Sequence, residues 1–212
     1  MRARSYFLIP VFILIVLSLF AADTFAGLVD DQAMAKGDDY YKKMKYDQAI
    51  LEFGKVIALA PRDSSGYVNR GLAYRAKGDF DKAIADFDKA LEIDPSDHTV
   101  YNDRGKAYEY KGYLIKALSD FSKAIKINTR YAQAYYNRGL VYQKKSHYEQ
   151  AIADYNKAIA INPREYIFYL SRGVAYYYQG NLEKAIEDWS RLNRKDVQSP
   201  VRIKIPFVAG DK

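Results

Sequence analysis

The sequence contains no cysteine among its 212 residues. This absence excludes disulfide bonds, thiolate metal sites, a cysteine nucleophile and a lipid-modified N-terminal cysteine. If the protein works in an oxidising compartment, its stability must therefore come from packing alone.

Histidine is nearly as scarce, and no set of residues suited to catalysis stands together. The only two histidines, His98 and His147, lie 49 residues apart. No glycine-rich phosphate loop and no spaced metal-ligand set accompanies them, so we interpret both as surface or capping residues. The sequence predicts no catalytic residue, no cofactor and no metal, and therefore a protein that is not an enzyme.

The sequence also lacks a basic surface spread along its length, although its net charge is +7. Residues 191–212 hold six basic and two acidic residues, which leaves the rest of the chain nearly neutral. Nucleic-acid binding favours a basic face with interleaved aromatic residues. We therefore expect no nucleic-acid partner, and we expect the basic tail to meet an anionic envelope surface or an acidic protein.

Long apolar runs are missing except at the start of the chain. Arg2 and Arg4 precede an apolar run over residues 6–22, and Thr24-Phe25-Ala26 follows. This order predicts a signal peptide over residues 1–26. The run is 17 residues long, near the minimum for crossing ~30 Å of hydrocarbon, so an uncleaved inner-membrane anchor is the alternative. In both cases we expect residues 27–212 to be exported, to the periplasm or as a secreted protein.

What the sequence has is a repeat of 34 residues. It is marked by five glycines at that spacing: Gly37, Gly71, Gly105, Gly139 and Gly173. A tyrosine follows each glycine by three residues, an alanine by twelve and an aromatic residue by sixteen. Small residues allow two helices to approach closely while aromatic rings fill the space beside them, so each copy is predicted to be an antiparallel helical hairpin. Gly78, Gly112 and Gly180 mark the breaks between helices, and Ser146 with Glu149 has capping-box spacing in the fourth copy.

Glycine, tyrosine, alanine, aromatic residue and then proline, in this order, resemble the tetratricopeptide repeat (TPR) family over residues 30–195. The resemblance implies an all-α fold, an α-α superhelix or TPR solenoid of antiparallel helical hairpins, in which first helices line a concave groove. The five copies are expected at about residues 30–63, 64–97, 98–131, 132–165 and 166–195. The first copy is the most degenerate, because Ala33 stands where the others have tyrosine.

The resemblance also implies which residues face the groove, because the family places them at fixed distances from the glycine. The predicted groove residues are Val68, Asn69, Leu72, Arg75, Asn102, Lys106, Tyr110, Tyr136, Asn137, Leu140, Gln143, Leu170, Val174, Tyr177 and Tyr178. The same pattern includes Glu109 and Lys144. Asn69 and Asn137 stand two residues before the glycine, where an amide would hold a peptide backbone or only satisfy neighbouring helices. The C-terminal half of the groove is the more apolar, which favours a partner that inserts hydrophobic side chains there.

A second periodic pattern pairs opposite charges. The residue before the glycine is basic and the fifteenth residue after it is acidic in every copy, with Lys36 and Glu52 in the first. We predict structural ion pairs, within or between adjacent repeats, among Arg70, Arg104, Arg138, Arg172, Asp86, Asp120, Asp154 and Asp188.

The last segment, residues 196–212, is expected to be an extended or disordered basic tail. Pro200 and Pro206 exclude a long closing helix, and Val201, Ile203 and Ile205 alternate with basic residues. This alternation favours an extended segment that covers the fifth repeat or a second molecule, and a disordered tail is the alternative.

Taken together, these patterns predict a non-catalytic adaptor or scaffold for protein–protein interaction. Its ligand is expected to be a peptide or protein segment in the concave groove. The alternative is a self-associating structural oligomer of the cell envelope.

Overall fold

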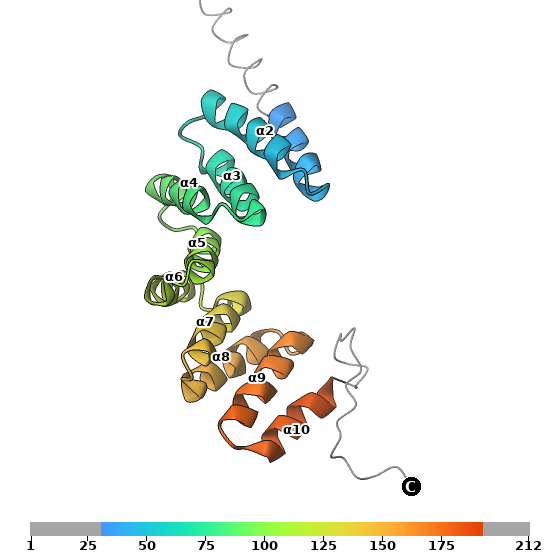
Figure 1. The fold of residues 1–212 in the computed structure, drawn as a ribbon. Coiled ribbons are helices and arrows are strands. Elements are labelled where there is room, and N and C mark those ends of the chain that lie inside the picture. Colours follow the sequence, from blue (N-terminus) through green and yellow to red (C-terminus); the bar gives the residue numbers. More distant parts are fainter. Residues whose placement is uncertain (1–30, 193–212) are drawn as a thin grey trace, which may run out of the picture. The chain divides into compact units, whose positions relative to one another are not determined.

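The computed structural model describes residues 31–192, in which every regular element is a helix (Figure 1). The predicted signal peptide, residues 1–26, and the predicted tail, residues 196–212, lie outside the described residues. The chain divides into two compact units between Asp94 and Pro95.

The first unit contains a helical segment over residues 31–42, followed by α2 (Tyr46–Leu59), α3 (Ser64–Lys77) and α4 (Phe80–Ile93). Helix α3 packs against both α2 and α4. Asp63 begins α3 by accepting a hydrogen bond from the backbone N–H of Ser65, which satisfies an amide that would otherwise lack a partner in the first turn.

The second unit contains three helical hairpins. They are α5 (His98–Tyr110) with α6 (Leu114–Ile127), α7 (Ala132–Lys144) with α8 (Tyr148–Ile161), and α9 (Tyr166–Tyr178) with α10 (Leu182–Arg191). Within this unit α6 packs against α7 and α8 against α9, so each hairpin buries its apolar side against the next.

The breaks between helices fall where the sequence predicts them. Gly78, Gly112 and Gly180 have φ angles of 90°, 78° and 85°, in the left-handed region that glycine adopts without cost. Ser146 takes this place in the fourth repeat with a φ of 59°. The predicted capping box is wrong, because the residue that precedes α8 is His147 and no side chain caps that helix.

The repeating glycine is explained by close helix packing. A Cβ atom on Gly105 would lie 2.7 Å from the ring of Phe121, and one on Gly139 would lie 2.7 Å from the ring of Tyr155. Both rings and the alanines Ala117 and Ala151 are fully buried. The glycine, alanine and aromatic positions therefore form the contact between the two helices of a hairpin.

Candidate functional site

The first helices of the second unit lie next to one another, α5 beside α7 and α7 beside α9. The Lys144 Nζ at the end of α7 is 3.9 Å from a carboxylate oxygen of Glu109 in α5. The ring centroids of Tyr136 in α7 and Phe168 in α9 are 5.1 Å apart. Eleven of the predicted groove residues lie on these three helices, and the other four, Val68, Asn69, Leu72 and Arg75, lie on α3 in the first unit.

Two predicted groove residues, Asn102 and Asn137, are buried between α5 and α7. The Asn137 Nδ2 donates a hydrogen bond of 2.8 Å to the Asn102 Oδ1, and the Asn137 Oδ1 accepts one of 3.1 Å from Gln133. The residues are only 3% and 4% exposed. Their prediction as partner-binding residues is therefore wrong, because these amides are used to join two helices.

In the first unit, Asn69 has the same kind of contact. Its Nδ2 lies 3.3 Å from the sulfur of Met34, which belongs to the preceding first helix. Val68, Leu72 and Arg75 on α3 are half-buried. The position two residues before the glycine thus faces the preceding repeat in both units.

Tyr136 and Leu170 are more buried than we expect for binding residues on the surface of a groove. The half-buried Tyr136 ring packs between Phe168 and Tyr155, and the Ser171 hydroxyl donates to its oxygen at 3.5 Å. Burial raises the pKa of Tyr136. Leu170 packs with Tyr169 in the fifth repeat. Both residues are half-buried and pack against core side chains.

Among the accessible predicted groove residues, α9 contributes two exposed tyrosines, Tyr177 and Tyr178, and α5 contributes one, Tyr110. Lys106, Leu140, Gln143 and Val174 are half-buried, whereas Tyr177 is 54% exposed. We call Lys106, Glu109, Tyr136, Leu140, Gln143, Val174 and Tyr177 the first-helix face. Tyr110 and Tyr178, the last residues of α5 and α9, stand at its border.

Tyr155 supports this face in a way that the sequence pattern does not predict. Its ring occupies the buried register of Phe121, but its hydroxyl donates a hydrogen bond of 2.9 Å to the Gln143 Oε1. This hydrogen bond from the buried Tyr155 holds the Gln143 side chain, which belongs to the first-helix face, in place. The signal for it is the tyrosine itself, which replaces phenylalanine at this position in the fourth copy only.

Glu109 is the half-buried carboxylate of the first-helix face. Burial raises the pKa of Glu109, and the nearby Lys144 and Lys106 lower it by a smaller amount. The 3.9 Å separation from Lys144 is too long for a hydrogen bond. The Glu109 carboxylate is therefore partly buried, and the nearby lysines do not fully offset the cost of burying its charge.

The structure brings together all four predicted arginine–aspartate pairs. Each arginine on a first helix meets the aspartate on the second helix of the same hairpin through two nitrogens. The distances from Nη2 to Oδ1 are 2.7, 2.8, 2.8 and 2.6 Å for Arg70–Asp86, Arg104–Asp120, Arg138–Asp154 and Arg172–Asp188. In the first repeat, Glu52 accepts from Lys55 at 2.7 Å.

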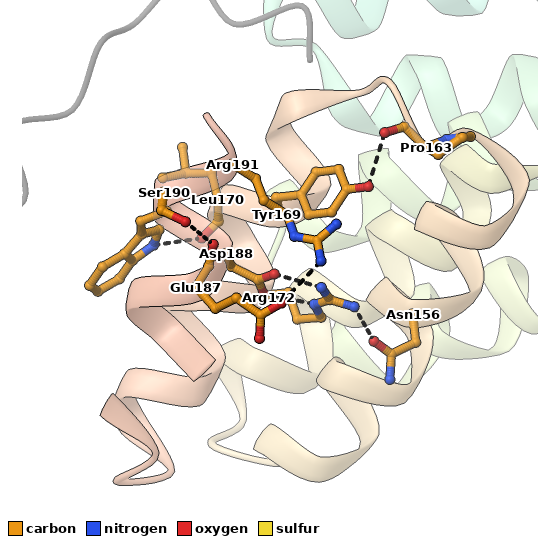
Figure 2. A network of polar contacts seen from close by, with 10 residues as sticks. Asn156, Pro163, Tyr169, Leu170, Arg172, Glu187, Asp188, Ser190 and Arg191 are labelled. Carbon is orange, nitrogen blue, oxygen red and sulfur yellow. Dashed lines mark hydrogen bonds and ion pairs between the residues drawn. The ribbon is translucent and has the colours of Figure 1, made fainter. Parts of the chain in front are cut away.

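Two of these arginines also reach the preceding repeat. Figure 2 shows Arg172 between Asp188 and Asn156, whose Oδ1 accepts from the Arg172 Nη1 at 2.6 Å. The Arg138 Nη1 likewise donates to the Ser122 hydroxyl at 3.0 Å. Each guanidinium therefore links three helices, which is the geometry of a structural contact and not of a ligand site.

Other site types are not found among residues 31–192. No group of three histidine, aspartate or glutamate residues there is placed to hold a metal ion. No helix in this range is long and apolar enough to cross a membrane. An open depression of about 610 Å³ is lined by Gln179–Glu183 at the α9–α10 turn, directly after Tyr178.

The chain is similar to known repeat proteins. A tetratricopeptide repeat model matches residues 64–97 and 132–165, the ranges given above for the second and fourth copies, and a second TPR model matches residues 110–146. The crystal structure of a MamA protein is 30% identical, with a TM-score of 0.68, over 78% of this chain and 90% of that chain. No protein of curated function matches the chain in sequence.

Two more distant structures show the same fold. PilF of Pseudomonas aeruginosa is 18% identical, with a TM-score of 0.72, over 78% of this chain and 75% of that one. YrrB, described as a TPR protein with an unusual peptide-binding site, is 19% identical, with a TM-score of 0.60, over 75% and 82%. The all-α fold of helical hairpins is confirmed, and it is the fold of protein–protein interaction scaffolds. The chain belongs to the tetratricopeptide repeat family.

Proposed function

We propose that this protein is a non-catalytic scaffold that binds a peptide or protein segment over the first-helix face of its second unit. The observation that carries the proposal is the partly open apolar strip formed by Leu140, Val174 and Tyr177. Leu140 and Val174 share a repeat position that holds Asp38 and Lys106 in other copies, and the position of Tyr177 holds Arg75 and Glu109 in other copies. The repeat therefore does not require an apolar side chain at either position. Aromatic residues that remain accessible beside smaller apolar ones are typical anchors of protein interfaces.

The chemistry of the face suggests how a segment would lie on it. Leu140, Val174 and Tyr177 would contact an apolar side chain of the partner. Lys106, Glu109 and Gln143 would meet polar groups beside it, with Glu109 accepting a hydrogen bond or a positive charge. The distantly related YrrB, which shares the fold, is described as having a peptide-binding site.

We further propose that the protein acts in the periplasm or cell envelope. Support for this location comes from the sequence of residues 1–26, in which two arginines precede an apolar run and small residues. Fractionation of the native cells followed by N-terminal sequencing of the mature protein tests it. A chain that begins at Gly27 in the periplasm supports cleavage, a membrane-bound chain with residues 1–26 supports anchoring, and a cytoplasmic chain contradicts both.

Affinity capture from an envelope extract tests the binding face. A partner retained by the wild-type protein should bind Tyr177→Ala at least tenfold more weakly, since a truncated interface anchor typically costs ~2 kcal/mol. Ile127→Ala is the matched control, because Ile127 is also exposed but lies at the end of α6. Equal capture by both variants would contradict the proposed face.

Sedimentation of the mature protein separates this proposal from self-association. A scaffold for another protein should remain a monomer as its concentration is raised. An oligomer whose size does not change on dilution would favour the structural alternative, in which a second copy covers the same face.

A further inference from the structure

The three turns between first and second helices of the second unit form one continuous edge. We define the turn edge as residues 110–116, 144–150 and 178–184, from the last residue of each first helix to the third residue of the second. Lys144 lies 3.9 Å from Glu109, the neighbour of Tyr110, which joins the first two turns. The rings of Tyr148 and Tyr178 stack at 5.6 Å, which joins the second turn to the third.

Large apolar side chains are concentrated on this edge. Ile115 is 78% exposed, and Tyr110, Tyr113, Tyr178 and Leu182 are between 48% and 67% exposed. These five are most of the seven large apolar residues exposed in the described part of the unit. Single exposed apolar residues are ordinary, but a cluster of them on one edge indicates a surface that binds a membrane or another molecule.

Positive charge is interleaved with these residues. The turn edge holds the lysines Lys111, Lys116, Lys144, Lys145 and Lys184, against two glutamates, Glu149 and Glu183. The Lys111 Nζ lies 5.0 Å from the ring centroid of Tyr113, and the Lys116 Nζ lies 5.5 Å from the same centroid. Ammonium groups and apolar rings therefore occupy the same narrow strip.

The first unit has two corresponding turns. The one at residues 42–48 resembles the turn edge, with three lysines, one aspartate and Met44 72% exposed, whereas the one at residues 77–82 has a different character. This second turn holds two lysines and two aspartates. Lys82 pairs with Asp79 at 2.8 Å, and Lys77 pairs with Asp47. None of its large apolar residues is exposed. The excess of lysine and exposed apolar residues is thus not a general consequence of building a turn in this fold.

We propose that the turn edge docks onto an anionic phospholipid surface. Ile115 and Leu182 would enter the boundary between headgroups and acyl chains, the tyrosines would lie at headgroup level, and the lysines would reach the lipid phosphates. Anionic lipid attracts basic residues at short range, and tyrosine is enriched where a protein meets a bilayer surface.

The composition favours lipid over an acidic protein as the occupant. The core of a protein interface is depleted of charge, and of lysine in particular. Here lysines alternate with the apolar residues instead of forming a rim around them, which is the pattern of segments that lie at a membrane surface. The proposal goes beyond partner binding and does not depend on it, because Leu140 and Val174 on the first-helix face lie outside the turn edge.

The natural absence of cysteine makes the contact measurable in the full chain. Ile115→Cys and Ile127→Cys each carry one polarity-sensitive fluorophore, the second at an exposed site at the far end of α6. The probes are vesicles of phosphatidylcholine mixed with phosphatidylglycerol, vesicles of phosphatidylcholine alone, and soluble polyglutamate. Residues 6–22 could hold the chain on any vesicle, so binding alone is not the readout. The readout is the emission wavelength of the fluorophore and the loss of its fluorescence to quenchers placed within the bilayer.

We expect a blue shift and quenching of the label at position 115 with the anionic vesicles, and neither at position 127. Replacing Lys111, Lys116 and Lys145 by glutamine should weaken this response about a hundredfold in lipid concentration, since each lysine contributes roughly fivefold. The same change at Lys123, Lys126 and Lys157, which are exposed on the second helices, should have little effect.

Several outcomes would overturn the proposal. A water-like label at position 115 in the presence of anionic vesicles would exclude insertion, and equal responses at positions 115 and 127 would exclude a specific edge. A response to polyglutamate but not to vesicles would assign the edge to an acidic protein. Equal responses to both kinds of vesicle would exclude a role for anionic lipid.

Discussion

Asn137 donates a side-chain hydrogen bond of 2.8 Å to Asn102, which lies 35 residues earlier on the preceding first helix. The same spacing separates Ser171 from Tyr136 and Asn69 from Met34, which are also in contact. In each pair, one residue lies two positions before the glycine of its repeat. Its partner lies three positions before the glycine of the preceding repeat. This pair of positions joins consecutive first helices, whereas the glycine, alanine and aromatic positions join the two helices of one hairpin.

Replacing Asn137 by alanine should lower the free energy of unfolding by about 1–3 kcal/mol. The change would leave the buried Asn102 Oδ1 without the hydrogen bond that it accepts from Asn137, and an unsatisfied buried polar atom costs this much. Urea unfolding followed by circular dichroism measures the loss. Gln150→Ala, at an exposed residue, should stay within about 0.5 kcal/mol of the wild type. Equal stability of the two variants would show that the amide pair contributes nothing.

Replacing Arg104 by alanine should destabilise the protein by about 1–3 kcal/mol, because the Asp120 carboxylate would keep its burial and lose a bidentate partner. The Asp120 side chain is only 9% exposed. The exposed pair Lys43–Asp39 provides the control, and Lys43→Ala should cost less than ~1 kcal/mol. If the double replacement Arg104→Leu with Asp120→Leu were as unstable as Arg104→Ala, an unpaired aspartate would not explain the loss.

Glu109→Gln should stabilise the protein at neutral pH. Burial raises the pKa of Glu109 above its ordinary value of 4.5, so the folded protein binds this proton more readily than the unfolded chain. Stability contributed by this group is present at low pH and is lost as pH rises through the folded pKa. Melting temperatures of Glu109→Gln and the wild type, measured at neutral pH and below pH 4.5, test this prediction. The higher melting temperature of the variant at neutral pH should vanish at the lower pH. A gain that is independent of pH would exclude charge burial as its cause.

Much of this fold follows from spacing, because residues that fill the same place in each repeat must recur. Gly105 with Phe121 and Arg104 with Asp120 are examples, and the structure shows both contacts within one hairpin. The binding residues are harder to predict, because variation between repeats has two causes. Asn137 varies because it matches Asn102 in the neighbouring helix, whereas Tyr177 varies and remains exposed. Burial separates these causes, and burial cannot be derived from the 34-residue period.

Tyr136 and Tyr177 should respond differently to truncation, although the sequence pattern treats both as surface anchors. Tyr136→Ala should cost roughly 2 kcal/mol of folding stability, because its half-buried ring packs against Phe168 and Tyr155. Tyr177→Ala should change stability by less than that, since the side chain is 54% exposed. Thermal melting of the two variants compares them directly. Equal losses would mean that Tyr177 belongs to the core of the repeat and not to a binding face.

The most direct test of the proposed scaffold is photocrosslinking in intact cells. A photoreactive phenylalanine analogue replaces Tyr177 on the first-helix face, and in a second strain it replaces Ile127, which is exposed on α6. The account predicts that a distinct protein becomes crosslinked at position 177 and not at position 127. No adduct at position 177, or the same set of adducts at both positions, would contradict partner binding on this face.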